Sequence, residues 1–284
     1  MNLTEDRNVE DEEKTDESAF ASAEAAETDA QGYFESRRKK KILMFGSEER
    51  IDQIMKRYAP LGKFEVIKKE ETKTGVIFKK KSLVEKKNTL YVDLAHLKLF
   101  YIRKGMLGKA SGIERSDILQ ILSDLPKEAR DLLLDLMEFG SVTYEQVCND
   151  LDEKQRILLM QKGLIEKYTS KSDNIMSLAS EEANYGYPQE KVYVRSKVHI
   201  PKFEDKVYEL SSFLKKDEVI DASCPKDSIE FSPEETSELL EELFLGEAIF
   251  DGVVYTPYYL CRYMSGTEKS KSERYDMYFP LQFL

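Results

Sequence analysis

Lysines gather in one part of the chain, where their spacing suggests binding to a polyanion. The candidates are Lys79, Lys80, Lys81, Lys86 and Lys87, all on or beside predicted strands. Clustered lysines bind phosphates because each neutralised phosphate releases condensed counterions. Lysine is also favoured on solvated strand faces and on sheet edges that must stay unpaired. Both interpretations remain open from the sequence.

Catalytic residues form no recognisable arrangement. The nearest match to a phosphate-binding loop, at Gly108-Lys109-Ala110, has Arg103 where the first glycine belongs and alanine where the hydroxyl belongs. His96 and His199 lie far apart on predicted strands, and the three cysteines are scattered without a metal-binding spacing. We therefore expect a protein that is not an enzyme and that uses no cofactor and no metal.

Composition narrows the class of protein further. The 284 residues are 41% hydrophobic and 34% charged, and no window approaches the roughly 18 uninterrupted apolar residues of a spanning helix. The first residues are acidic, whereas an export signal or presequence would be basic and apolar. Scattered cysteines indicate a reducing compartment. We expect a cytoplasmic protein with no membrane contact.

The net charge of −11 hides a partition along the chain. Residues 1–36 carry 12 acidic and 2 basic side chains, and residues 37–109 carry 8 acidic and 21 basic ones. Residues 110–284 carry 34 acidic and 20 basic side chains. Residues 1–36 also lack an apolar periodicity, so we predict a disordered acidic tail. Such a tail either keeps the protein in solution or folds back on the lysine-rich segment and competes with polyanions.

Residues 37–112 are predicted to form a lysine-rich, small α+β domain. An apolar run at Ile42–Gly46 indicates a buried strand. Ser47 is predicted to cap a helix, and Ile51, Ile54, Met55 and Tyr58 follow at helical spacing. Pro60 and Gly62 are expected to end this helix. Alternating segments at 64–68, 75–79 and 90–102 predict three strands.

Residues 113–180 carry the most specific pattern. Helices are predicted over 127–139, 144–150 and 153–162, with a short strand at 141–143 and a hairpin of 164–168 with 175–178. This order, and the junction Leu159–Ile165, resemble the winged helix-turn-helix family. The resemblance implies that the third helix enters a DNA major groove and that the wing touches the backbone. The implied contacts are Lys154, Gln155, Arg156 and Gln161 on the helix, with Lys167, Thr169 and Lys171 on the wing.

The charge of this segment also fits another role. Residues 113–180 hold 8 basic and 13 acidic side chains, so the same module could dock onto a protein instead of DNA.

Residues 181–284 are predicted to form a C-terminal α+β domain. It contains a strand at 191–200, an apolar stripe at helical spacing from Phe203 to Leu214, a helix that begins at Ser232-Pro233, and paired strands at 249–264 and 274–279. His199–Phe203 and Tyr255–Tyr259 make residues 125–284 similar to regions appended to archaeal HerA-type DNA-translocase ATPases. The resemblance implies an accessory module, since the ATPase core is absent.

The sequence thus predicts the α+β class, with a winged helix flanked by two small α+β domains and a disordered N-terminal tail. We expect a non-enzymatic nucleic-acid-binding protein whose partner is double-stranded DNA, with a regulatory or accessory role beside a DNA-processing ATPase. The alternative is a protein–protein adaptor that docks through the winged helix and a tyrosine-rich C-terminal sheet.

Overall fold

The chain folds into two compact units in a computed structural model. One comprises Met1–Asp117 with Phe203–Leu284, and the other comprises Ile118–Lys202. The structure describes residues 18–21, 27–40, 48–74, 80–104, 110–170, 191–203, 205–210, 215–267 and 270–280. Lys79, Lys171 and the predicted strands at 42–46 and 175–178 lie outside these residues. Both α-helices and β-strands are present, as the predicted α+β class requires.

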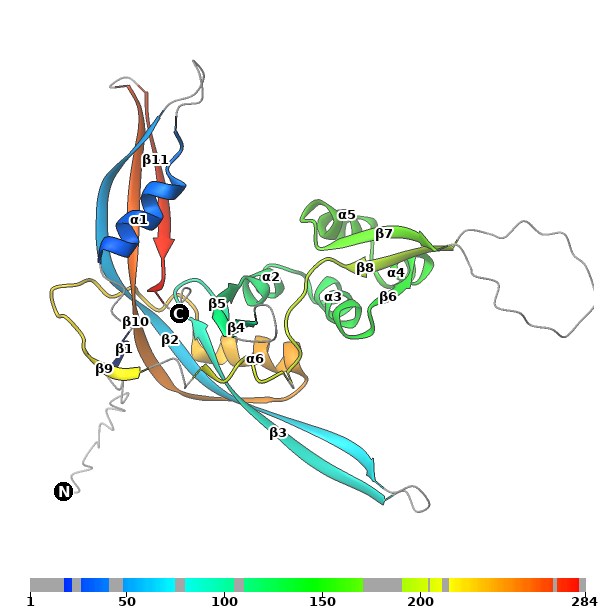
Figure 1. Cartoon of the computed structure of the whole chain (residues 1–284). Helices are drawn as coiled ribbons and strands as arrows, with labels where there is room; N and C mark the ends of the chain where they lie inside the picture. Colours follow the sequence, from blue (N-terminus) through cyan, green and yellow to red (C-terminus); the bar gives the residue numbers. More distant parts are fainter. Residues whose placement is uncertain are drawn as a thin grey trace, which may run out of the picture. The chain divides into compact units, whose positions relative to one another are not determined.

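The larger unit is organised around two long antiparallel strands. Residues of β2 (Glu49–Thr74) pair with β10 (Glu247–Thr267) from Glu49↔Ser265 to Ile67↔Glu247. The sheet has the order β5-β4-β3-β2-β10-β1-β9, and β11 also pairs with β10 (Figure 1). The other strands are β1 (Ser18–Ala21), β3 (Lys80–Asp93), β4 (Lys98–Lys104), β5 (Ala110–Ser116), β9 (Lys215–Val219) and β11 (Ser270–Tyr278).

The predicted helix over residues 47–58 is wrong, because Glu49 to Tyr58 belong to strand β2. Ile54 lies opposite Cys261 and Ile51 lies opposite Tyr263 in β10. Those partners are about two hundred residues away, so the local pattern could not reveal them. β-Branched and aromatic side chains pack well on a pleated surface, and long-range pairing here overrides a helical spacing of apolar residues.

The predicted disordered tail is wrong for residues 27–36, which form most of helix α1 (Glu27–Arg37). Ala30 and Phe34 are completely buried, together with Cys261, Tyr263 and Tyr278 from β10 and β11. Helix α1 lies across these strands in Figure 1. Two apolar side chains on one face thus dock a helix that is otherwise polar. Strand β1 also falls within the predicted tail, whereas residues 1–17 and 22–26 lie outside the described residues.

The predicted separate domains 37–112 and 181–284 share one sheet instead. The pairing of β2 with β10 joins them, so residues before and after the smaller unit build one larger unit. The predicted boundary at residue 180 also differs, because the strand at Lys191–Ser196 belongs to the smaller unit, which extends to Lys202. A strand belongs to the unit that contains its pairing partners, and those partners cannot be read from the sequence of the strand itself.

The predicted helix at Ser232-Pro233 is confirmed as α6 (Pro233–Phe244). The hydroxyl of Ser232 accepts a hydrogen bond from the backbone N–H of Glu235, which completes a capping box. The predicted helix from residue 203 to 214 is wrong in its described part, where residues 205–208 form bends and a turn. Its apolar residues nevertheless reach the core, since Phe203 lies 5.3 Å from Phe244 between ring centroids.

A buried ion pair lies in the core of the larger unit. Asp93 is fully buried, and its Oδ2 lies 2.6 Å from Nη2 of Arg115. The Arg115 guanidinium also lies over the ring of Phe279, 3.9 Å from its centroid. Burial raises the pKa of Asp93, but the hydrogen bond with His96 and the charge of Arg115 outweigh it and hold that pKa below its usual range. This pair ties β3 to β5.

The smaller unit contains helices α2 (Ile118–Ser123), α3 (Lys127–Phe139), α4 (Tyr144–Asp150) and α5 (Glu153–Gln161). Its three strands, β6 (Ser141–Thr143), β7 (Ile165–Ser170) and β8 (Lys191–Ser196), form a sheet in the order β6-β8-β7. The three predicted helices are confirmed, as is the first hairpin strand. Strand β7 pairs with β8, whereas the predicted second hairpin strand, 175–178, lies outside the described residues. The core contains Leu133, Leu136, Val147, Leu159 and Val194.

Candidate nucleic-acid interface

Helix α5 turns one polar face outward from the smaller unit. It starts at a capping box, in which the Asp152 carboxylate accepts from the N–H of Gln155 at 2.8 Å and the Gln155 amide oxygen accepts from the N–H of Asp152 at 3.2 Å. Leu159 is fully buried against the unit's core. Lys154, Ile157 and Gln161 are exposed, and their spacing places them on the opposite face.

Two of the predicted contact residues on α5 act within the unit. The Arg156 guanidinium donates hydrogen bonds to the backbone carbonyls of Leu151 at 2.6 Å and Cys148 at 3.3 Å. It thereby supplies donors to carbonyls at the C-terminal end of α4. Gln155 forms the cap and also donates to Glu128 at 3.2 Å. Neither side chain is available to a ligand without breaking these bonds. The outward contacts of α5 are therefore reduced to Lys154 and Gln161, with Ile157 between them.

The hairpin of β7 and β8 carries more positive charge than α5. On β7, Lys167 lies over the ring of Tyr144, with Nζ 3.5 Å from the centroid, and Thr169 is exposed. The antiparallel pairing runs from Ile165↔Ser196 to Ser170↔Lys191. The third predicted wing residue, Lys171, lies outside the described residues.

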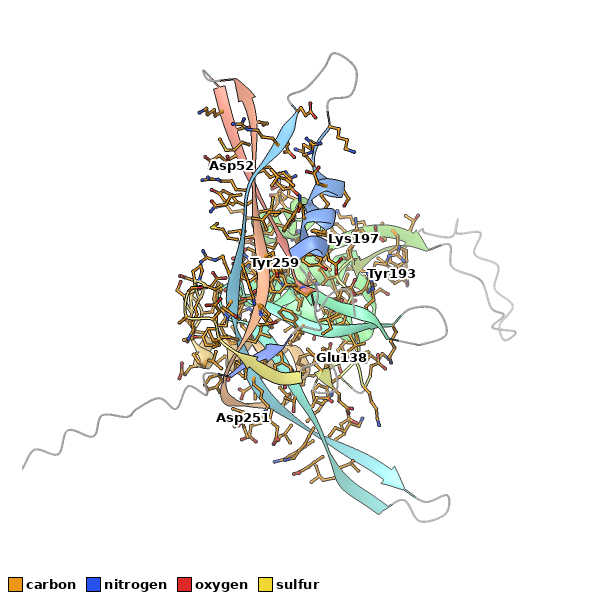
Figure 2. All side chains as sticks on the ribbon, turned by 60° about the vertical axis from the view of Figure 1, so that its left-hand side comes forward. Asp52, Glu138, Tyr193, Lys197, Asp251 and Tyr259 are labelled. Carbon is orange, nitrogen blue, oxygen red and sulfur yellow. The ribbon has the colours of Figure 1, made fainter. Side chains whose placement is uncertain are left out.

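Strand β8 contributes cations that the sequence interpretation missed, because it assigned this strand to the C-terminal domain. Lys191 and Arg195 on β8 are exposed, as is Lys197 directly after the strand, which Figure 2 labels. Residues 191–202 hold four basic and no acidic side chains. Within the described chain, Lys191 and Lys197 make no ion pair, whereas Arg195 binds Glu166 at 2.6 Å. The run of basic residues without an acid was the signal that could have marked this strand.

The remaining predicted contacts lie on a two-stranded ribbon of the larger unit. Beyond Ile67, β2 pairs only with β3, so residues 68–74 and 80–86 form an arm, which we call the lysine arm (Figure 1). Its residues, 68–74 and 80–86, hold six basic and three acidic side chains. Lys80 and Lys81 lie on this arm in β3. Leu83, 70% exposed, and Val84, 40% exposed, lie beside them.

Two lysines at the base of this ribbon have acidic partners. Lys86 Nζ lies 2.7 Å from Glu70, and Lys87 Nζ lies 3.1 Å from Glu65 across the strands. These pairs are exposed or half-buried, so each contributes little to stability and a phosphate could compete for the lysine. The predicted cations of the described residues therefore fall into two groups, one on each unit.

Comparisons of the chain with protein-family models, with curated proteins and with solved structures found no match. None of the described helices is long and apolar enough to cross a membrane. Among the described residues, no group of three or more His, Cys, Asp or Glu side chains lies close enough together to hold a metal ion.

Proposed function

We propose that the smaller unit is a winged helix-turn-helix module that binds double-stranded DNA. Helix α5 would lie in the major groove, and the hairpin of β7 and β8 would be the wing that contacts phosphates. The observation that carries this proposal is the combination of element order α3-β6-α4-α5-β7-β8 with the segment 191–197, which consists of strand β8 and the residue after it and holds three exposed cations and no acid.

The exposed side chains suit these roles chemically. Lys154 and Gln161 can donate to base edges or phosphates, and the apolar Ile157 between them can contact a thymine methyl group. Lys191 and Lys197, which have no ion-pair partner within the described chain, would supply the sequence-independent part of the affinity. The lysine arm would add a second electrostatic contact on longer DNA.

The experiment is a salt titration of duplex binding by the full chain. Between about 50 and 200 mM salt, affinity should fall by orders of magnitude if six or more phosphates are engaged. The triple variant Lys154→Ala, Lys191→Ala, Lys197→Ala should bind more weakly and show a shallower dependence on salt, by about 0.9 in log–log slope for each lost phosphate contact.

The matched control is Lys271→Ala, which removes an exposed lysine from β11 in the larger unit. It should bind duplex as the unmodified chain does. An equal loss of affinity per removed lysine in both variants would mean that net charge alone drives the binding, and the assignment of α5 and the wing would be withdrawn.

A second candidate function is protein docking by the same module. The observation in its favour is exposed apolar surface, since Phe139 is 70% exposed at the end of α3 and Ile157 is 44% exposed on α5. In this case the chain would serve as an adaptor for a larger assembly, such as a DNA-processing ATPase. Absent or salt-independent duplex binding would favour this candidate over the first.

A further inference from the structure

The outer face of the wing carries two tyrosines in direct register. Alternation along the strands puts Ile165, Val194 and Ser196 on the buried face. Tyr168 and Tyr193 lie opposite each other on the other face. Their rings are stacked, with centroids 5.8 Å apart and an interplanar angle of 26°. Figure 2 labels Tyr193 on this unit.

Cations surround this pair. The Arg195 guanidinium lies over the ring of Tyr168, 5.2 Å from its centroid, while its Nε binds Glu166. Lys191 lies two residues before Tyr193 on β8 and therefore on the same face of the sheet. The result is a row of two aromatic rings and a guanidinium plane with lysine beside it, on a half-exposed sheet surface.

Packing of the core does not account for this row. Both tyrosines are only partly buried, and neither hydroxyl makes a hydrogen bond within the described chain. A tyrosine kept for structure generally buries its ring or bonds its hydroxyl. Aromatic rings next to cations on a sheet face are instead suited to unpaired bases, which stack on the rings while their phosphates meet the cations.

We propose that this outer face of the wing binds unpaired bases of a single-stranded segment that continues from the duplex. A duplex stacks its bases internally, so its bases cannot use the two rings, whereas a single strand can. This inference rests on the proposed function for the position of the duplex on α5. It adds the substrate class: a nucleic acid with a junction between double and single strands.

The test compares three probes with the full chain: a blunt duplex, the same duplex with a single-stranded oligothymidine tail, and the free oligothymidine. The chain should bind the tailed duplex most tightly. Tyr168→Leu with Tyr193→Leu keeps apolar area on the strands but removes the ring faces. This double variant should bind the tailed duplex about five- to a hundredfold more weakly, the equivalent of one stacked base, and the blunt duplex within about twofold of the unmodified chain.

The conservative control is Tyr168→Phe with Tyr193→Phe, which retains both rings and loses only the hydroxyls. It should bind all three probes as the unmodified chain does. Photocrosslinking of a tail that contains 5-iodouracil gives a readout that needs no variant. Crosslinks on the peptides with Tyr168 or Tyr193 are expected, and their absence from both peptides would overturn the proposal.

The two proposals fail in distinguishable ways. Equal affinity for blunt and tailed duplex, or equal loss on both probes in the leucine variant, would overturn the stacking surface and leave duplex binding intact. Binding to oligothymidine without binding to the blunt duplex would overturn the proposed function but support the stacking surface.

Discussion

Helix α1 offers a sharp test of the fold, because its sequence alone predicts disorder. Phe34 is completely buried, and its ring makes edge contacts with Tyr263 at 6.4 Å and Tyr278 at 6.3 Å between centroids. Truncation to alanine at a fully buried phenylalanine costs about 3–5 kcal/mol. The hydrogen bond from the Tyr263 hydroxyl to the Phe34 carbonyl involves the backbone and persists in the variant. We therefore expect Phe34→Ala to weaken docking of α1 by about 3 kcal/mol or more.

Amide hydrogen exchange measures this docking directly. A loss of about 3 kcal/mol corresponds to roughly a hundredfold rise in the population of open states, and so to a similar loss of protection along α1. The matched control is Phe139→Ala, which truncates a phenylalanine that is 70% exposed and should change stability by no more than about 0.5 kcal/mol. If α1 amides exchange at the rate of an unstructured chain before any substitution, the helix is not docked and the reasoning fails.

Three further predictions concern polar contacts. Asp93→Asn leaves the Arg115 guanidinium buried without its counter-charge, so urea denaturation should show a loss of about 3–5 kcal/mol in the free energy of unfolding. Adding Arg115→Met should recover part of this loss, and no recovery would contradict the ion-pair argument. The carboxylate of Glu49 accepts two hydrogen bonds from Arg274, at 2.8 and 3.0 Å. These bonds outweigh the effect of burial and lower the pKa of Glu49 from 4.5 to about 2. The stability that the ionised Glu49 contributes is present above pH 4.5 and is lost as pH falls toward about 2. In thermal melts, the melting temperature of Glu49→Gln should therefore fall less over this pH range than that of the unmodified protein. Asp152→Ala removes the cap of α5 and should destabilise the smaller unit by about 1 kcal/mol, which Asp152→Asn should largely restore in a denaturant titration.

The local parts of the fold were accessible from the sequence. Three of the predicted helices begin at a capping box in the structure, formed by Thr143, Asp152 and Ser232. Caps and apolar spacing act over three or four residues, so they are visible in any window of the sequence. The candidate cations on α5 and β7 were named from the family resemblance that this order of helices and strands suggested.

The functional assignment of those cations required contacts that no local pattern contains. Arg156 was predicted from the sequence to contact DNA, but in the structure its guanidinium donates hydrogen bonds to backbone carbonyls at the C-terminal end of α4. Lys86 and Lys87 count as part of a basic cluster but have glutamate partners across the strands. Conversely, Lys191 and Arg195 join the hairpin only because β8 pairs with β7.

By itself, then, the sequence determined the α+β fold class and the helices of the smaller unit, since helices are built from contacts between near neighbours in the chain. Only the tertiary structure decided that residues 49–58 form a strand, that Phe34 is buried, and that segments before and after the smaller unit share one sheet. The physical reason is the same in each case. A strand or a docked helix is stabilised by partners hundreds of residues away, and its own residues do not specify which partners those are.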